Sequence, residues 1–429
     1  MATTIDGIAS GGSFVELMKR LQPQRELDRL WQLQYPLLGL VKKADDFVGS
    51  QIDVPLEHDH PSRSRTFTYA STGGSNAGQN QNPSASVKYN LTRKKDYATG
   101  VLDAETMHAS RNDMGSWVRA LQREQSNTVL SLRKNTAISL YRDTGGSIGI
   151  IDASGPQNGD GTGDMFQLTN KSDTANFVVG QALHIDPDDG SGSLTDSDVV
   201  YVRRVDFDAG QVFCSLTQGG AAGTISTNIA AVAAADYVFN AGDFGASIHG
   251  LASWIPLTAP SSGENFLGID RSVNVVRLAG HRLNDTSMSY EEMVQELAAR
   301  IMYSGGGNLT CFMSPIQVKQ FALELDTKVV RDPGGTGKAG FRGIAVDTVA
   351  GTVEVLGDPA CPENRMYMLD LSCWKIHHLK GLPHLVEDDG LARLRVADAD
   401  QVEFRYRLWM NLACTAPGKN GVAALPTAF

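Results

Sequence analysis

The sequence predicts an α+β chain, and three patterns lead to that class. Residues 112–142 contain no proline and repeat apolar side chains at helical spacing, which predicts one long helix. Residues 52–56, 87–91 and 402–410 alternate apolar and polar side chains, which is typical of strands with one buried face. Residues 289–325 have helix, strand and helix patterns in succession, as in a sheet that is covered by helices.

The long helix is expected to act as a structural beam of roughly 45 Å, at ~1.5 Å per residue. Asn112 or Asp113 can cap its first turn, and Gly145 and Gly146 end it. Its apolar stripe comprises Met114, Trp117, Val118, Leu121, Val129, Leu132, Ile138, Leu140 and Tyr141. The opposite face, expected to meet water or a polar neighbour, carries Arg119, Gln122, Arg123, Gln125, Ser126, Arg133 and Lys134.

Length and composition limit the function classes. At 429 residues, with 41% hydrophobic and 20% charged side chains, the chain has the composition of a soluble globular protein with two or three cores. The net charge of −10 argues against a dedicated nucleic-acid binder, although an acidic protein can enclose DNA without holding it tightly. The scattered cysteines predict reduced thiols, and the absence of a signal-like start or a long apolar run predicts a cytoplasmic product.

Residues 1–47 are expected to form an arm. Ser13 and Glu16 have capping-box spacing at the start of an amphipathic segment, and Trp31 continues its apolar face. Because the segment has too few apolar residues for a core of its own, it is expected to dock on something else. The basic residues of the arm could contact nucleic acid or a neighbour's acidic groups, and a solvated helix face is the alternative.

Residues 52–97 are expected to form a long two-stranded hairpin whose tip, residues 71–86, is rich in Ser, Gly, Asn and Gln. Basic residues flank it, namely Arg63, Arg65, Lys88, Arg93, Lys94 and Lys95. An isolated two-stranded ribbon is marginal in water, so it is expected to lie on another subunit. A disordered surface loop remains the alternative.

The rest of the chain alternates short strands with turns and helices. Residues 148–240 predict a small β-rich domain with strands at 177–179, 182–185, 199–205 and 212–216. Ser289 and Glu292 form a capping box, and Gly305 to Gly307 end that helix. A strand over 309–313, a helix opened by Ser314 and Pro315, a Gly-rich loop over 326–343 and strands near 344–346, 351–355 and 366–371 follow.

No catalytic or metal-binding constellation is found. Residues 331–339 resemble a phosphate-binding loop but lack its leading glycine and its final Ser or Thr. An aspartate cluster over 186–198 misses the spacing of a calcium loop, and a solvated turn is the better interpretation. The pairs His58/His60 and His377/His378 lack zinc-site spacing. We therefore expect no enzyme, no cofactor and no metal.

Several short sequence segments, taken in their order along the chain, resemble those of a known protein family. These are residues 250–256 (Gly-Leu-Ala-Ser-Trp-Ile-Pro), 266–272, 277–280, the triple glycine at 305–307, and 313–317 (Met-Ser-Pro-Ile-Gln). In this order the chain resembles the major capsid proteins of tailed bacteriophages, which have the Hong Kong 97-type fold.

The resemblance implies a division of the chain into parts. These are an N-arm (1–48), an extended β-hairpin loop (49–105), a peripheral domain with a long spine helix (106–147), an inserted β-rich domain (148–240), a second peripheral segment (241–282), an axial domain (283–395) and C-terminal peripheral strands (396–429). Arm and loop would clamp neighbouring subunits, and the loop over 326–343 would meet its copies at capsomer centres. The implied inter-subunit contacts are Trp31, Arg63, Arg65, Phe67, Tyr69, Lys88, Tyr89, Arg93, Lys94, Arg331 and Lys338.

The function implied is a structural protein of the virion, a major capsid protein that self-assembles in the host bacterial cytoplasm into hexamers and pentamers of an icosahedral shell around bacteriophage double-stranded DNA. Partners would be further copies, a separate scaffolding protein, a portal, a decoration protein and DNA contacted non-specifically, with no membrane. An insertion that only decorates the shell could be deleted without loss of assembly. The Lys–Asn cross-link of some members is not carried over, because no catalytic acid is identified. The alternatives are an encapsulin-like nanocompartment shell and, from another class, a secreted β-rich adhesin.

Overall fold

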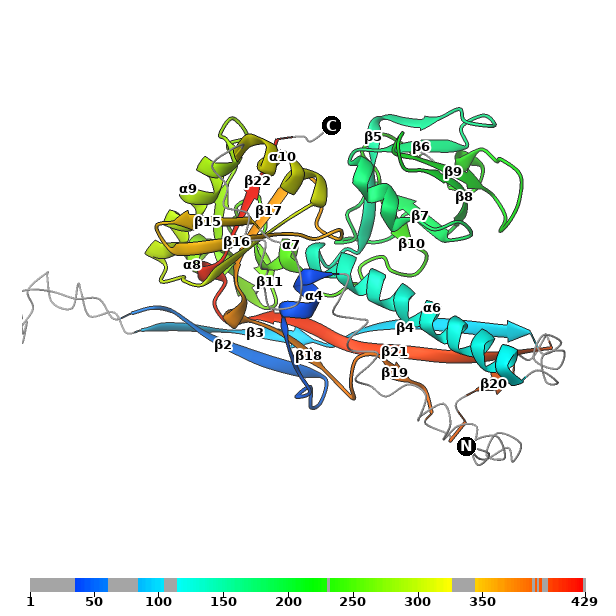
Figure 1. Ribbon diagram of the computed structural model, residues 1–429, viewed down its shortest axis with the longest axis horizontal. Coiled ribbons are helices and arrows are strands. Elements are labelled where there is room, and N and C mark those ends of the chain that lie inside the picture. Colours follow the sequence, from blue (N-terminus) through cyan, green and yellow to red (C-terminus); the bar gives the residue numbers. More distant parts are fainter. Residues whose placement is uncertain are drawn as a thin grey trace, which may run out of the picture.

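The computed structural model describes residues 35–60, 84–103, 114–229, 232–325, 344–387, 390–391, 393–395 and 400–426. Three bodies make up this part of the chain: an elongated platform of long strands under a long helix, a sheet covered by helices, and a β-barrel that stands above the helix (Figure 1). None of the helices in these residues is long and apolar enough to span a membrane.

The platform combines helix α6, Met114–Tyr141, with a six-stranded sheet centred on β21. The strands of this sheet are β1 (Lys42–Ala44), β4 (Lys94–Asp103), β18 (Trp374–His378), β19 (His384–Leu385), β20 (Leu394–Arg395) and β21 (Gln401–Cys414). β21 pairs antiparallel with β4 along almost all of β4, from Gln401↔Asp103 to Met410↔Lys94. Val129 and Leu132 of α6 pack on Phe404 and Tyr406, which confirms this part of the predicted apolar stripe.

The predicted polar face of the long helix is partly wrong. Gln125 and Arg133 are buried, and the Arg133 guanidinium lies over the ring of Tyr35, 5.3 Å from its centroid. The reason is that the short helix α4, Pro36–Leu40, packs on this side of α6 and buries Leu37 and Leu38 in the main core. Residues 35–47 have no separate core and dock on the main core of the same chain. Ser13, Glu16 and Trp31 lie outside the described residues.

The hairpin pairs β2, Gln51–Asp59, with β3, Ala85–Thr92, in the register Ile52↔Leu91, Val54↔Tyr89 and Leu56↔Val87. The predicted pairing of these two segments is confirmed. Its inner face packs on the chain's own core, since Tyr89 contacts Trp254 and Phe266 with ring centroids 5.0 and 6.1 Å apart. Residues 94–103, expected in the extended loop, instead form β4 of the platform sheet.

The helix-covered layer is a six-stranded sheet in the order β13-β22-β17-β14-β16-β15. Its elements are β13 (His281–Leu283), α9 (Tyr290–Tyr303), β14 (Leu309–Met313), α10 (Pro315–Leu325), β15 (Ile344–Thr348), β16 (Gly351–Gly357), β17 (Arg365–Asp370) and β22 (Gly421–Ala424). The predicted capping box is confirmed, because Ser289 and Glu292 each bond the other's backbone N–H. Strand β22 was expected with the peripheral strands, but it lies in this layer between β13 and β17.

The barrel is closed by six strands in the order β10-β5-β6-β9-β8-β7. These are β5 (Ser147–Gln157), β6 (Met165–Leu168), β7 (Ala182–Asp186), β8 (Val200–Asp206), β9 (Gln211–Ser215) and β10 (Tyr237–Asn240). The predicted turn between residues 206 and 211 joins β8 to β9. The strand expected over residues 177–179 is wrong, because Phe177 follows the 3-10 helix η2, Lys171–Asn176, and the chain then turns at Gly180 with φ 87°.

Short elements connect the three bodies. They are η3 (Ile225–Thr227), α7 (Leu251–Trp254), β11 (Asn265–Phe266), β12 (Ile269–Asp270), η4 (Arg271–Asn274), α8 (Val275–Ala279), η6 (Leu371–Cys373) and η7 (Pro417–Lys419). Trp254 of α7 is fully buried and donates its indole N–H to Leu412 O at 3.0 Å, which ties this connection to β21.

Gly250 at the exit of the barrel gives a test of this packing. A Cβ there would lie 2.3 Å from the carbonyl oxygens of both Ser139 and Arg142, and backbone cannot move aside as a side chain can. We expect G250A to lower the free energy of unfolding by roughly 2–4 kcal/mol in urea titrations, as for other overpacked sites. The control G307A places its Cβ where no atom lies within 4 Å, and an equal loss there would contradict the packing argument.

Candidate subunit-contact surfaces

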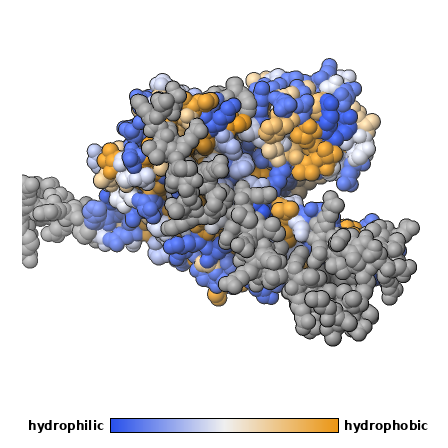
Figure 2. Space-filling view, in the orientation of Figure 1, coloured by the Kyte–Doolittle hydropathy of each residue, from blue (hydrophilic) through white to orange (hydrophobic). Residues whose placement is uncertain are grey.

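The outer face of the β2–β3 hairpin is polar and carries both charges. Lys88 donates from Nζ to Asp53 Oδ2 at 3.0 Å, with 65% of its side chain exposed, and Glu57 is exposed on the same strand as Asp53. Figure 2 shows mainly hydrophilic surface over the hairpin. An exposed pair of this kind contributes little to stability, so these charges are available for polar contacts with another protein. Arg63, Arg65, Phe67 and Tyr69, expected to contribute further contacts, lie outside the described residues.

Tyr89, expected as an inter-subunit contact, serves the chain's own core instead. It is 0% exposed, and its hydroxyl donates to Leu278 O at 3.0 Å. Burial raises its pKa well above the usual range, so the phenol stays neutral. The alternation of the strand placed Tyr89 correctly on one face, but only the tertiary structure shows that this face is the inner one.

Arg93 and Lys94, also expected contacts, hold the root of the hairpin within the chain. Arg93 donates to Gly49 O at 3.0 Å, and its guanidinium lies over the rings of Phe47 and Trp409. Lys94 donates from Nζ to Gly245 O at 3.1 Å, and burial lowers its pKa. Among the predicted contacts that the structure describes, Lys88 alone has a largely exposed side chain.

A groove of about 580 Å³ runs along the end of β2 that lies farthest from the root of the hairpin, and no sequence pattern predicted it. Residues 56–60 of β2 and its end form one wall, and Arg277 and Tyr303 lie on the other. Arg277 bonds Asp59 Oδ1 at 2.7 Å, and an amide hydrogen bond from Asn274, aided by His58 and Arg277, lowers the pKa of Asp59. Tyr303 is 94% exposed at the end of α9, where an unpaired aromatic ring is available to a partner.

The sheet face of β4–β21 that points away from α6 is a second partly open surface. Tyr97 and Val101 are 55% and 42% exposed, and Trp409 donates its indole N–H to Tyr97 Oη at 3.2 Å. The guanidinium of Arg407, which is itself buried, lies 4.4 Å from the centroid of the Trp409 ring. Exposed aromatic side chains on a sheet face are typical of protein contact surfaces.

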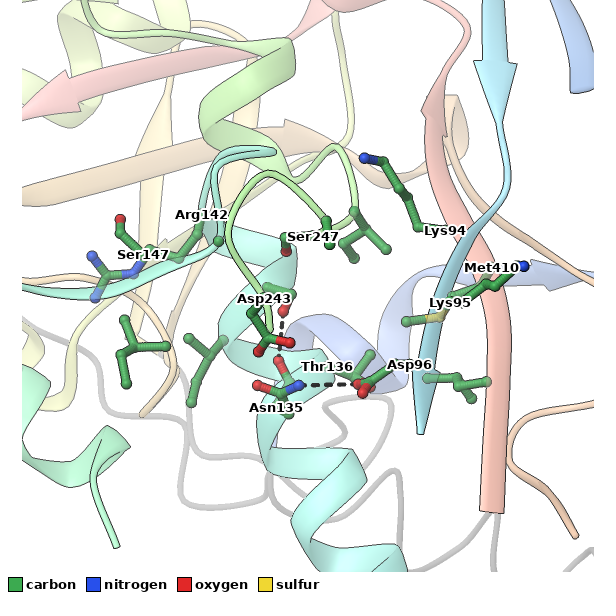
Figure 3. A pocket seen from close by; sticks show the side chains of 17 residues that line it. Lys94, Lys95, Asp96, Asn135, Thr136, Arg142, Ser147, Asp243, Ser247 and Met410 are labelled. Carbon is green, nitrogen blue, oxygen red and sulfur yellow. Dashed lines mark hydrogen bonds between the residues drawn. The ribbon is translucent and has the colours of Figure 1, made fainter. Parts of the chain in front are cut away.

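A polar cavity lies where β4, α6 and the barrel exit meet (Figure 3). Asn135 points its amide at Asp96, with a distance of 3.0 Å from Nδ2 to Oδ2. Asn240 bridges the other side, donating to Asp243 Oδ2 at 2.8 Å. Burial raises the pKa of Asp96 to about 6, the Asn135 hydrogen bond opposes this, and the nearby Asp243 raises it further. The cavity is thus a polar joint inside the chain, lined by acidic and basic side chains of β4, α6 and the barrel exit.

Groups that could do chemistry have structural roles in the described residues. The five cysteines are buried and free, and burial raises their pKa values. No cluster of three or more potential metal ligands is found in the part of the chain that the structure describes. Asp186 and Asp188 accept backbone N–H groups within their turn, and His377 bonds Asp46 Oδ1 at 2.6 Å. Arg331 and Lys338 lie outside the described residues.

The chain was compared with protein families, curated proteins and solved structures. No protein-family model and no curated protein matches the chain. Its fold is similar to a structure described as the cyanophage A-1(L) capsid asymmetric unit, with 13% identity, a TM-score of 0.47 and coverage of 91% of this chain and 93% of that one. Mycobacterium phage Ogopogo follows at 11% identity, TM-score 0.40 and coverage of 92% and 93%. The capsid of a native GTA particle has 9% identity, TM-score 0.39 and coverage of 91% and 90%.

Asp96 makes the stability of the fold depend on pH. Its pKa is higher in the folded chain, about 6, than in an unfolded one, about 4, so the folded state binds this proton more tightly. The carboxylate therefore destabilises the fold above pH 6, and this cost is relieved as the pH falls from 6 towards 4. We expect D96N to raise the free energy of unfolding by about 2–3 kcal/mol at pH 8, and by much less at pH 4.5.

Denaturant titrations at the two pH values measure this difference. D208N, in an exposed turn, is the control and is expected to have the same small effect at both. A gain from D96N that is equal at pH 4.5 and pH 8 would contradict the assignment of a raised pKa to Asp96.

Proposed function

We propose that the chain is the subunit of a capsid shell, a major capsid protein whose copies form hexamers and pentamers around double-stranded DNA. The observation that carries the proposal is the order of its parts: a projecting hairpin, a 28-residue helix on long strands, a barrel, and a helix-covered sheet reached through the segment at residues 250–280. This is the order that the sequence resemblance implies. The segments at 250–256, 266–272 and 277–280, which carry the resemblance, lie in one region of the fold.

A subunit of a shell must make many modest contacts with its neighbouring copies. The hairpin is fixed within the chain at its root by Arg93, along β3 by Tyr89 and at the far end of β2 by Arg277, while its outer face stays polar and open. A rigid root with an open face suits a clamp on a neighbour, because little conformational freedom is lost on contact. Repeated over many copies, heterologous contacts of this kind close a shell without any one of them being tight.

We propose partners for the subunit and a site of assembly as well. Residues 1–34 and 61–83 would supply additional contacts between copies, and the loop at 326–343 would lie at the capsomer centre. A separate scaffolding protein, a portal and a decoration protein would complete the particle, which would assemble in the host cytoplasm. An encapsulin-like compartment shares this architecture and differs in its contents, which would be protein. The neighbours of the fold give no observation that favours an adhesin.

The first test is negative-stain electron microscopy of the purified chain, with ultraviolet absorbance of the particle fraction. We expect closed shells or rings of five and six subunits, because the proposed contacts are between copies. Nucleic acid in particles from infected cells supports the viral function, and cargo protein in its place supports the compartment. A monomer in every salt and scaffold condition would refute the shell.

Lys88 tests the role of the hairpin face. Since its side chain is 65% exposed and its ion pair is weak, K88E should leave the melting temperature within about 2 °C. The same change should reduce the yield of shells several-fold if this face meets a neighbour. K319E, at another lysine of the described surface on α10, is the control. Unchanged shell yield for K88E would exclude the hairpin face from assembly.

A further inference from the structure

The barrel is attached to the rest of the chain at a neck and through residues 170–173, which make separate contacts with the layer and with the spine helix. The neck is the place where the chain enters after α6 and leaves before α7. Gly145 and Gly190 pack backbone against backbone there, since a Cβ on Gly145 would lie 1.8 Å from Asp189 O. Gly245 also donates its N–H to Gly145 O at 2.9 Å. A neck of this kind fixes one end of the barrel to the spine helix.

The second attachment joins the start of η2 and the residue before it to the helix-covered layer. Asn364, in the loop between β16 and β17, donates from Nδ2 to Asn170 Oδ1 at 3.1 Å. Its neighbour Glu363 is 3% exposed; burial raises the pKa of this carboxyl, and the nearby Ser172 opposes that rise. Asn364 has φ 63°, a left-handed conformation that asparagine tolerates and that aims its side chain at the barrel.

A buried ion pair joins the same side of the barrel to the spine helix. Arg142, at the end of α6, bonds Asp173 of η2, and only 11% and 5% of these two side chains are exposed. Breaking one partner of such a pair leaves an uncompensated buried charge, so the pair strongly favours a single orientation. Residues 170–173 therefore touch both the platform and the layer.

From these contacts we propose that the barrel is a brace, which fixes the angle between the platform and the helix-covered layer by bonding to both. A loose ornament would need only the neck. Through residues 170–173 the barrel contacts α6 and the layer at the same time. These contacts oppose rotation of the layer relative to α6, and rotation of the barrel about its neck. This role is intramolecular and does not depend on the proposed shell. In a shell, it would set the shape of each subunit and hence the curvature.

Spin labels on the barrel and on the layer test the brace in the full chain. A153C and Q295C place labels at exposed positions of β5 and α9, and the buried native cysteines do not compete. We expect a single narrow distance distribution between the two labels in the parent. N364G removes the amide and keeps a residue suited to φ 63°, and D173N removes one charge with little change in shape. Combined, they should broaden the distribution at least two-fold.

The matched control is D160N, which weakens an ion pair within the barrel, between Asp160 and Arg203, and leaves the brace contacts in place. It should keep the narrow distribution. A narrow distribution in N364G/D173N would show that the neck alone orients the barrel and would overturn the brace. A broad distribution already in the parent would overturn it as well.

Deletion of residues 147–240 separates a brace from an ornament. Labels at S131C on α6 and Q295C on α9 should report a broadened distance once the barrel is replaced by a short Gly-Ser linker. An unchanged distance would overturn the proposal. If the deleted chain does not fold, the decision rests on N364G/D173N. A broad distance together with normal shells would keep the brace and deny it a role in curvature, whereas absence of shells from the intact chain would refute only the shell function.

Discussion

The buried carboxylate of Asp358 is the point at which the platform and the helix-covered layer are joined. Its side chain is fully buried and accepts hydrogen bonds from Tyr141 Oη at 3.0 Å, Leu37 N at 3.1 Å and Ala360 N at 2.9 Å. These donors belong to the spine helix, the N-terminal segment and the loop between β16 and β17. Burial raises the pKa of Asp358 and the three hydrogen bonds oppose that rise, so the group is stable only while all its partners stay in place. The loop that carries Asp358 also carries Asn364, so the core and the barrel share one joint.

Local patterns in the sequence predicted the elements whose causes are local. The capping box of Ser289 and Glu292 and the alternation over residues 52–56 and 87–91 depend on neighbours a few residues away, and the structure contains both. The turn expected at the aspartates near residue 186 is present, because their carboxylates bond nearby backbone N–H groups, but Asp186 itself is buried at the end of β7 and not solvated.

Features that depend on distant residues could not be predicted in this way. Arg133 looks like a surface residue until α4 is placed over it, and Tyr89 looks like a contact residue until Trp254 and Phe266 surround it. Strand β4 reads as a continuation of the hairpin because its pairing with β21 joins residues about 300 positions apart. The groove at Arg277 and Tyr303 has no local pattern at all, since four separate segments form it.

The subunit is rigid inside and keeps exposed side chains available for contacts with other copies. The root of the hairpin, the neck of the barrel and the Asp358 joint are closed by buried or backbone contacts, while Lys88, Tyr97 and Tyr303 remain exposed. Such a subunit can bind its copies with little loss of conformational freedom, which favours assembly through many weak contacts.

Charge-detection mass spectrometry at neutral pH would measure the mass distribution of the purified 46.1 kDa chain in solution. For a capsid subunit we expect capsomer masses of five or six chains and a narrow megadalton population of closed particles, with little material between. A chain that stays at the mass of one copy, with or without a scaffold, would refute the assembly into a shell.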